Sequence, residues 1–320
     1  MATLPAGHTI RRPADSDLAE LLALVHAHDI AAMGTPGFSA DGVRDVLHGP
    51  HHDASYDSWV VVDPAGDFAA WAYVDNRYGY PPDALARERV DVIVHPDAAP
   101  GMHVPLLAIT VDRVAQRARA AGRHQVQVHT GHLHGQKELR SAITAAGFGF
   151  ERRYARMRRD LTGEEPPPPA PPGTLVRAVD PKRDARTMHR VIDSAFAELP
   201  EHTSVDFDAW WGSVDAATPW DECLLAEVAG EAVATLQSTA QEGSDGGGWI
   251  RNLAVLPSHR GRGLARLLLA TGFARYAANG RTWAGLGVNT GNPTGAFALY
   301  ESVGLRVTHQ ADFYSQTLSL

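Results

Sequence analysis

A glycine-rich turn between a strand and a helix is the feature that most restricts how this chain can fold. It reads Arg260-Gly261-Arg262-Gly263-Leu264-Ala265, between a strand pattern over residues 249–256 and a helical pattern over residues 263–279. Two glycines one residue apart allow a backbone to wrap closely around another group. Unpaired N–H groups and the positive end of the helix dipole then point into the same space, where Arg260 and Arg262 add charge. The pattern predicts an anion site, most simply for the pyrophosphate of a cofactor.

The turn differs from the two best-known phosphate-binding motifs. No Gly-Lys-Ser/Thr follows it, so it is not a nucleotide P-loop. It also lacks the third glycine of a dinucleotide-binding fingerprint and the acidic residue about 20 positions further on. A second element follows downstream: an apolar strand over residues 283–288, then Asn292, then a helix that carries Leu299-Tyr300 and ends at Gly304-Leu305.

Together these two elements resemble the GNAT superfamily of acetyl-CoA-dependent N-acetyltransferases. The family motif Arg/Gln-x-x-Gly-x-Gly/Ala is satisfied by residues 260–265. The family's second mark is an Asn shortly before a helix that carries Leu-Tyr and ends at Gly-Phe, and here Leu305 replaces the usual Phe. The resemblance covers residues 174–320 in full and says almost nothing about the acceptor.

The resemblance implies roles for individual residues. The turn would hold the pyrophosphate of acetyl-CoA through residues Arg260, Gly261, Arg262, Gly263, Leu264 and Ala265. The backbone of Leu253-Ala254-Val255 would pair with the pantetheine arm like an added strand, with one N–H facing the thioester oxygen. Asn292 either contacts the cofactor or caps the helix that follows it. Tyr300 is the candidate general acid, because a phenol with a pKa of about 10 is protonated at neutral pH.

The sequence does not identify a general base. Members of the family often carry a glutamate early in the strand before the turn, but this strand reads Trp249-Ile250-Arg251-Asn252. Asp221, Glu222 and Glu227 are possible bases, directly or through water, and no base is needed if the amine arrives neutral. Cys223, the only cysteine, lies in a strand pattern and is expected to be a small core residue rather than a nucleophile.

Composition is that of a water-soluble enzyme, and we expect a cytoplasmic location. Apolar residues make up 44% of the 320 residues, enough for two cores, and the net charge of −8 does not favour a nucleic-acid partner. A single cysteine excludes an intrachain disulfide, and no apolar run is long enough for a membrane span. No metal site is predicted, because no cysteine or nearby carboxylate completes the His-rich segment at residues 129–134. We expect a monomer or a homodimer.

A proline-rich linker at residues 162–173 predicts two domains, because consecutive prolines cannot form a helix or a central strand. Residues 1–161 and 174–320 begin with similar phrases and repeat the same order of strand and helix patterns, which indicates an internal duplication. We therefore expect an α/β fold with two tandem GNAT-like domains, each a mixed and mostly antiparallel sheet with helices on both faces. The layout is similar to that of mycothiol synthases.

The two copies differ where the chemistry would take place. Superposing Val94-His95-Pro96 on Val255-Leu256-Pro257 places Ala99-Pro100-Gly101-Met102 on Arg260-Gly261-Arg262-Gly263. Superposing Gly147 on Gly304 places Ile143 at the position of Tyr300. The first copy is thus predicted to be non-catalytic, with a role in packing or in shaping the acceptor pocket.

The acceptor is predicted only as a class: an amine of a small molecule or a peptide. From Thr162 onward the chain has 12 Lys plus Arg and 18 Asp plus Glu, a difference of −6, which would attract a cationic amine. Trp210, Trp211 and Trp220 lie where this family often lines its acceptor site, although packing is the favoured use. Two alternatives stay open: a non-catalytic acetyl-CoA sensor or interaction protein, and a mycothiol-synthase-like enzyme acetylating a cysteinyl amine on a sugar conjugate.

Overall fold

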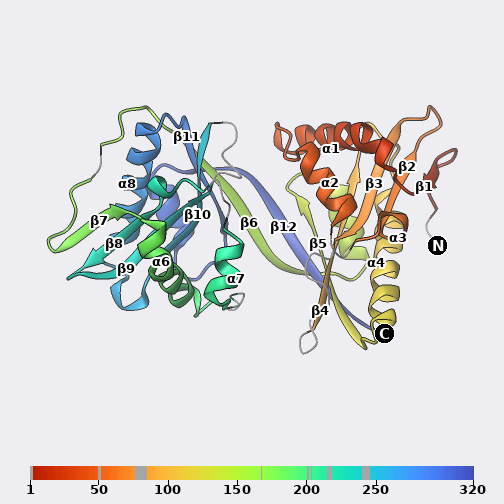
Figure 1. The fold of residues 1–320 in the computed structure, drawn as a ribbon. Coiled ribbons are helices and arrows are strands. Elements are labelled where there is room, and N and C mark those ends of the chain that lie inside the picture. Colours follow the sequence, from red (N-terminus) through yellow and green to blue (C-terminus); the bar gives the residue numbers. More distant parts are fainter. Residues whose placement is uncertain are drawn as a thin grey trace. The chain divides into compact units, whose positions relative to one another are not determined.

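The computed structural model describes residues 3–49, 52–75, 85–166, 168–199, 202, 204–214, 218–239 and 246–320. The chain divides into two compact units, which Figure 1 shows and which are described separately here. Unit 1 comprises Met1–Tyr154 and His309–Leu320, and unit 2 comprises Ala155–Thr308.

Unit 1 contains a mixed sheet with the strand order β1-β2-β3-β4-β5-β12. Its strands are β1 (Thr9–Arg11), β2 (Ser58–Val62), β3 (Phe68–Asp75), β4 (Ala86–Val94), β5 (Gln125–Leu133) and β12 (Arg306–Ser319). The pairing of β4 with β5 is parallel, and the other pairings in this order are antiparallel.

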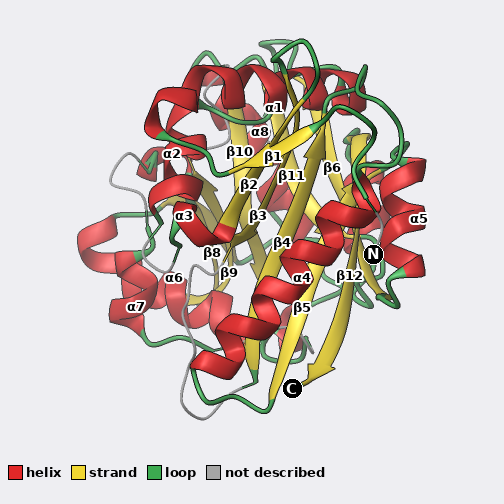
Figure 2. Cartoon of the chain, turned by 90° about the vertical axis from the view of Figure 1, so that its right-hand side faces the viewer, coloured by secondary structure: helices red, strands yellow, loops and turns green. Residues whose placement is uncertain are grey.

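Helices cover both faces of this sheet. They are η1 (Asp15–Asp17), α1 (Leu18–Met33), α2 (Ala40–His48), α3 (Ala54–Asp57), α4 (His103–Ala120) and α5 (Lys137–Ala145). Side chains of β2 alternate between two cores: Val61 packs with α4, and Val60 packs with α1 and α2. Figure 2 shows α4 running along the strands.

Unit 2 repeats this plan with the strand order β6-β11-β10-β9-β8-β7. Its strands are β6 (Gly149–Asp160), β7 (Thr174–Ala178), β8 (Leu224–Val228), β9 (Glu231–Thr239), β10 (Gly247–Val255) and β11 (Trp283–Asn289). The pairing of β10 with β11 is parallel, whereas β7, β8, β9 and β10 pair antiparallel in turn.

Two cores lie on opposite faces of the sheet in unit 2. The helices are α6 (Pro181–Phe196), α7 (Phe207–Gly212), η2 (Trp220–Glu222), η3 (Pro257–His259), α8 (Leu264–Ala278) and α9 (Ala296–Ser302). One core contains Leu268 and Phe273 of α8, and the other contains Met188 and Val191 of α6. The predicted fold class, α/β with a mixed sheet flanked by helices, is confirmed, although the strands of the two predicted sheets form one continuous order.

The final strand of each half of the sequence is shared between the units: β6 belongs to unit 2 from Ala155 onward, and β12 belongs to unit 1 from His309 onward. Ala155 and Met157 of β6 are fully buried in the α8 core of unit 2. Conversely, β12 pairs with β5 over nine residues, and its Tyr314 packs in the core of unit 1. The compact units therefore differ from the predicted division into residues 1–161 and 174–320. The strands lie where the sequence pattern predicts them, but a pattern of alternating residues does not say which sheet a strand joins.

Candidate functional site

The glycine-rich turn leads directly from β10 into α8, as the sequence predicts. Gly261 and Gly263 adopt left-handed backbone conformations, with φ of +73° and +80°, and a Cβ added at either position would point into open space. Gly263 is the N-cap of α8 and offers no side chain to its first turn. Among the described residues, none accepts a hydrogen bond from the backbone N–H groups of residues 261–266. Unpaired donors at the start of a 15-residue helix are able to bind an anion.

The side chains of Arg260 and Arg262, the two arginines of the turn, make different contacts. Arg260 donates to the carboxylate of Glu198 at 2.7 Å and to the carbonyl oxygen of Ala195 at 2.8 Å, so its side chain anchors the turn to the end of α6. Arg262 is exposed and donates only to the carbonyl oxygen of Ser258 at 3.2 Å. Charge from the side chains at the anion site therefore comes from Arg262 rather than from both arginines.

Next to the turn, β10 and β11 stop pairing. Their parallel register runs from Gly247 opposite Trp283 to Ile250 opposite Leu286 and ends there, although both strands continue. We call residues 252–255 the open edge of β10. Two parallel strands that part at their carboxyl ends leave one edge of each without a neighbouring strand, and an extended ligand can pair with it.

A bulge in β10 lies where the open edge begins. The register with β9 shifts between Ile250 and Asn252, so Arg251 is the extra residue. An extra residue exchanges the two faces of the strand that follows it. Accordingly, Ile250 and Leu253 both pack on the α8 core, and Ala254 packs in the α6 core.

The direction of the backbone hydrogen bonds indicates which of Leu253, Ala254 and Val255 could pair with a pantetheine arm. The N–H of Leu256 donates to the carbonyl oxygen of Val233 on β9 at 2.9 Å. In an antiparallel pair, alternate residues point their N–H and C=O groups to the same side. Ala254 therefore pairs with β9, whereas the backbone groups of Leu253 and Val255 point toward the open edge.

Tyr300 lies on α9 and packs in the same core as Leu253, Val255 and Val288. Its side chain is buried, and burial raises the pKa of its phenol to about 12. No hydrogen-bond partner of the hydroxyl lies among the described residues. A protonated phenol with an unused donor, next to the open edge, fits the predicted general acid.

Asn292 closes the turn before α9. Its side-chain oxygen accepts hydrogen bonds from the backbone N–H of Thr294 at 2.9 Å and from the hydroxyl of Thr294 at 2.7 Å. Its backbone N–H donates to the carbonyl oxygen of Asn289 at 3.1 Å. Asn292 therefore forms an Asx-type turn and does not cap α9, whose N-cap is Gly295, and its contact with the cofactor stays a prediction.

None of the three carboxylates considered as a base lies at the open edge. Asp221 and Glu222 accept hydrogen bonds from Asn279, the C-cap of α8, so they lie near the opposite end of a helix about 20 Å long. Glu227 is held by Arg177 at 2.7 Å, on a strand separated from β10 by β9. The structure supplies no base at the site from these residues.

Cys223 and Trp210 are packing residues, and Trp211 stacks on Trp220. Cys223 is fully buried, and burial raises the pKa of its thiol to about 12, which leaves it unreactive at neutral pH. Trp210 packs in the α6 core, whereas Trp211 is exposed and stacks on Trp220 with ring centroids 5.7 Å apart.

The corresponding strand ends in unit 1 are bridged by side chains. The register of β4 with β5 ends at Arg89 opposite His129, so these strands also part. His28 of α1 contacts the carbonyl oxygen of Val94 at 3.0 Å and the side chain of Gln136 at 2.7 Å. Gln136 accepts a hydrogen bond from the backbone N–H of Leu133 at 2.7 Å. In this copy the side chains of His28 and Gln136 thus bridge the strand ends, whereas in unit 2 the carbonyl oxygen of Val255, the counterpart of Val94, accepts a hydrogen bond from Arg260 of the turn at 3.3 Å.

The turn and the helix of the first copy also lack the features of a cofactor site. Met102, at the position of Gly263, is fully buried at the start of α4. Ile143, at the position of Tyr300, is fully buried in the core of unit 1.

Sequence reasoning missed a polar pair at the bulge. The side-chain amide of Asn252 donates to the side-chain oxygen of Gln237 at 2.7 Å, and Gln237 is 1% exposed. In the sequence, both residues fall within strand patterns, and the bulge that places Asn252 on this face leaves no signal there.

The described part of the chain holds neither a metal cluster nor a membrane span. No group of three or more His, Cys, Asp or Glu among those residues could hold a metal ion. No helix among them has both the length and the apolar character needed to cross a membrane.

Comparison with known proteins gives a consistent family. The sequence model of the Acetyltransferase (GNAT) family matches residues 185–305. A mycothiol acetyltransferase from Thermobispora bispora is 31% identical over 294 residues, which cover 86% of this chain and 90% of the relative. A crystal structure of a GCN5-related N-acetyltransferase from Sphaerobacter thermophilus is 26% identical, with a TM-score of 0.82 over 99% of this chain and 98% of that one. A tandem GNAT protein from the clavulanic acid biosynthesis pathway, 15% identical, shares the fold with a TM-score of 0.64 over 97% and 98% of the two chains.

Proposed function

This chain belongs to the GNAT acetyltransferase family, and from that premise we propose that it transfers the acetyl group of acetyl-CoA to a primary amine of a small molecule or peptide. The observation that carries the proposal is the junction of the turn and the open edge. Donors at residues 261–266 and the backbone of Leu253 and Val255 lie on one continuous stretch of chain. This arrangement suits a ligand with a pyrophosphate at one end and an amide-bearing arm at the other.

The residues present fit this substrate. The left-handed Gly261 and Gly263 leave open space where a phosphate would come close to the backbone. Arg262 adds a mobile positive charge, and Arg260 holds the turn in place through Glu198. The N–H of Leu253 would stabilise the oxygen that becomes negative when the thioester carbonyl is attacked.

The reaction forms one bond and breaks one. The neutral amine nitrogen attacks the carbonyl carbon of the thioester, the C–N bond forms, and the C–S bond breaks. Tyr300 donates its proton to the departing thiolate and regains one from solvent, while the amine nitrogen loses its extra proton to solvent. Burial keeps the pKa of Tyr300 near 12, so the phenol is protonated throughout the neutral range.

Nothing in the described site removes a proton from the amine before attack. The carboxylates considered as bases are engaged elsewhere, and the strand before the turn carries Trp249 and Arg251 on the acceptor side. We therefore propose that the acceptor enters as the free amine, so that the rate rises with pH as the amine deprotonates in solution.

The test is acetyl-CoA turnover with a panel of primary amines, measured as release of free thiol and as the mass gain of the product. Turnover with at least one amine supports the proposal. Tight CoA binding without turnover on any amine would favour the sensor alternative, and absence of CoA binding would refute both.

Mycothiol acetylation is a second candidate, favoured by the name of the 31% identical relative. It predicts efficient turnover of the deacetylated mycothiol precursor and poor turnover of simple amines. A panel that contains this precursor decides between the two candidates.

A further inference from the structure

A layer of arginine and tryptophan side chains lies beside the start of the open edge, on the face of unit 2 that also carries α6. Because Ala155 and Met157 point into the α8 core, the alternate residues of β6 point to the opposite face. We call this layer the arginine–tryptophan face. It consists of Arg156, Arg158, Trp249, Arg251 and Trp283.

Each of two arginines lies over an indole ring. The guanidinium carbon of Arg156 is 4.2 Å from the ring centre of Trp249, and that of Arg158 is 4.4 Å from the ring centre of Trp283. At these distances the positive charge of each guanidinium is attracted to the face of the indole ring. These stacks hold positive charge in fixed positions.

Because Gly285 and Gly287 of β11 have no side chains, the indole of Trp249 can extend to the point where β10 and β11 stop pairing. A Cβ added at Gly285 would lie 2.9 Å from the ring of Trp249, and one added at Gly287 would lie 3.9 Å from it. Gly287 is the first residue of β11 beyond the paired register. The indole of Trp249 therefore covers the floor of the sheet at the start of the open edge.

Arg251 is the member of the layer best placed to meet a ligand. It is the exposed extra residue of the bulge, one position before the open edge. Its guanidinium donates to the carbonyl oxygen of Ser213, just after α7, at 3.2 Å. Within the described residues it has no carboxylate partner.

The arginines of the arginine–tryptophan face carry a charge opposite in sign to the net charge of the sequence from Thr162 onward. Residues from Thr162 onward carry a net −6, which predicts an acceptor site that attracts cations. β6 adds two arginines to this face, and its one carboxylate there, Asp160, accepts from Arg158 at 3.2 Å. Among the described residues, β10 and the part of β6 from Ala155 onward thus bring three arginines and one carboxylate to this face.

We propose that Arg251 is a specificity-determining residue that binds an oxyanion carried by the acceptor close to its amine. The ligand chemistry is a carboxylate, as in an amino acid, or a phosphate. This inference rests on the proposed function, since it describes the acceptor of that reaction. A guanidinium at the rim of the open edge would orient such an acceptor with its amine toward the thioester.

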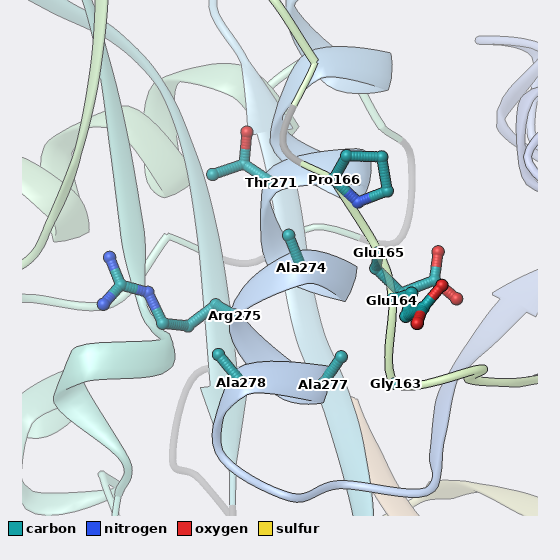
Figure 3. A pocket seen from close by; sticks show the side chains of 9 residues that line it. All are labelled: Gly163, Glu164, Glu165, Pro166, Thr271, Ala274, Arg275, Ala277 and Ala278. Atoms are coloured by element: carbon teal, nitrogen blue, oxygen red, sulfur yellow. The ribbon is translucent and has the colours of Figure 1, made fainter.

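The experiment compares matched amines in steady-state acetyl transfer. Alanine against ethylamine tests a carboxylate, and phosphoethanolamine against ethanolamine tests a phosphate, with kcat/KM calculated for the concentration of the neutral amine at the assay pH. Full-length wild type is compared with Arg251→Met, with Arg251→Lys, and with Arg275→Met as the control. Arg275 lies on α8 and lines a pocket together with Glu164 and Glu165 of the linker. Figure 3 shows that its side chain points away from these two glutamates.

We expect wild type to prefer the anionic member of at least one pair by about 10- to 100-fold in kcat/KM, mainly through KM. Arg251→Met should erase this preference, Arg251→Lys should restore part of it, and Arg275→Met should leave it intact. The pair that shows the preference identifies carboxylate or phosphate.

Equal turnover of anionic and uncharged amines by wild type would overturn this inference and leave the proposed function standing. The inference is also overturned if Arg251→Met slows both members of a pair equally. Failure of every amine in the panel, with CoA bound, would instead count against the proposed function itself.

Discussion

The sharpest test of the strand exchange is the substitution Met157→Ala. Met157 is fully buried, and it lies in the α8 core of unit 2 although it precedes the linker in sequence. Truncating a buried methionine to alanine typically costs about 2 to 5 kcal/mol, because the transfer free energy is lost and a cavity remains. Met157 touches a core that also holds Leu268 and Tyr300, so unit 2 should bear this cost.

Met102→Ala is the matched control. Met102 is equally buried and also precedes the linker, but it lies in the core of unit 1 beside α4. Native-state amide hydrogen exchange, read by mass spectrometry, reports the free energy of local opening in each segment. Peptides from residues 264–289 report on unit 2, and peptides from residues 86–120 report on unit 1.

We expect Met157→Ala to accelerate exchange in the unit 2 peptides by about 30-fold or more, which corresponds to the lower limit of 2 kcal/mol. Met102→Ala should accelerate exchange in the unit 1 peptides. If Met157→Ala instead loosens residues 86–120 and spares residues 264–289, β6 belongs to the first half as the sequence suggested, and the exchange of strands is wrong.

Four further predictions concern the site and the halves of the chain. Gly263→Asp should abolish CoA binding in calorimetry, because it places a negative charge at the anion site. Gly230→Asp is the control and should leave CoA binding intact, since Gly230 has a similar φ of +82° and open space around an added Cβ. Wild type should bind one CoA per chain, and two equivalent sites would contradict the bonded strand ends of unit 1. Tyr300→Phe should lower kcat by about 10² to 10⁴ with little change in CoA affinity. Because burial places the pKa of Tyr300 near 12, its deprotonation should cause no fall in kcat below about pH 10, and a Tyr300-dependent fall near neutrality would refute its role. Residues 174–320 expressed alone should be poorly soluble, and co-expression with residues 1–173 should restore CoA binding; a stable, active fragment would disprove the need for β6.

Local features of the site could be predicted from the sequence because they depend on few neighbouring residues. Gly261 and Gly263 adopt the left-handed conformations that favour glycine, and a helix starts directly after them. Tyr300 lies on the predicted helix, which begins at Ala296 after Asn292 and Thr294 have formed a turn.

Features that depend on partners distant in sequence could not be predicted. Arg260 satisfies the family motif, yet its side chain contacts Glu198, 62 residues earlier. The sequence leaves Glu222 open as a possible base, but Arg281 and Asn279 hold it near the other end of α8. Side-chain destinations of this kind are set by the packing of α6 and α8 on the sheet.

Strand exchange gives a physical reason for the first half to persist without chemistry of its own. Arg159 of β6 donates to the carbonyl oxygen of Val303 at 2.9 Å, directly after α9, and its guanidinium lies 5.0 Å from the ring centre of Phe273. The helix that carries Tyr300 is thus held from a strand encoded before the linker. Deleting the first half would remove this brace and open the α8 core, while deleting the second half would remove β12 from unit 1. In the first copy, Met102 and Ile143 replace the turn glycine and the tyrosine without any loss of this packing. These two positions can therefore vary, whereas the exchanged strands and the core residues are needed for folding.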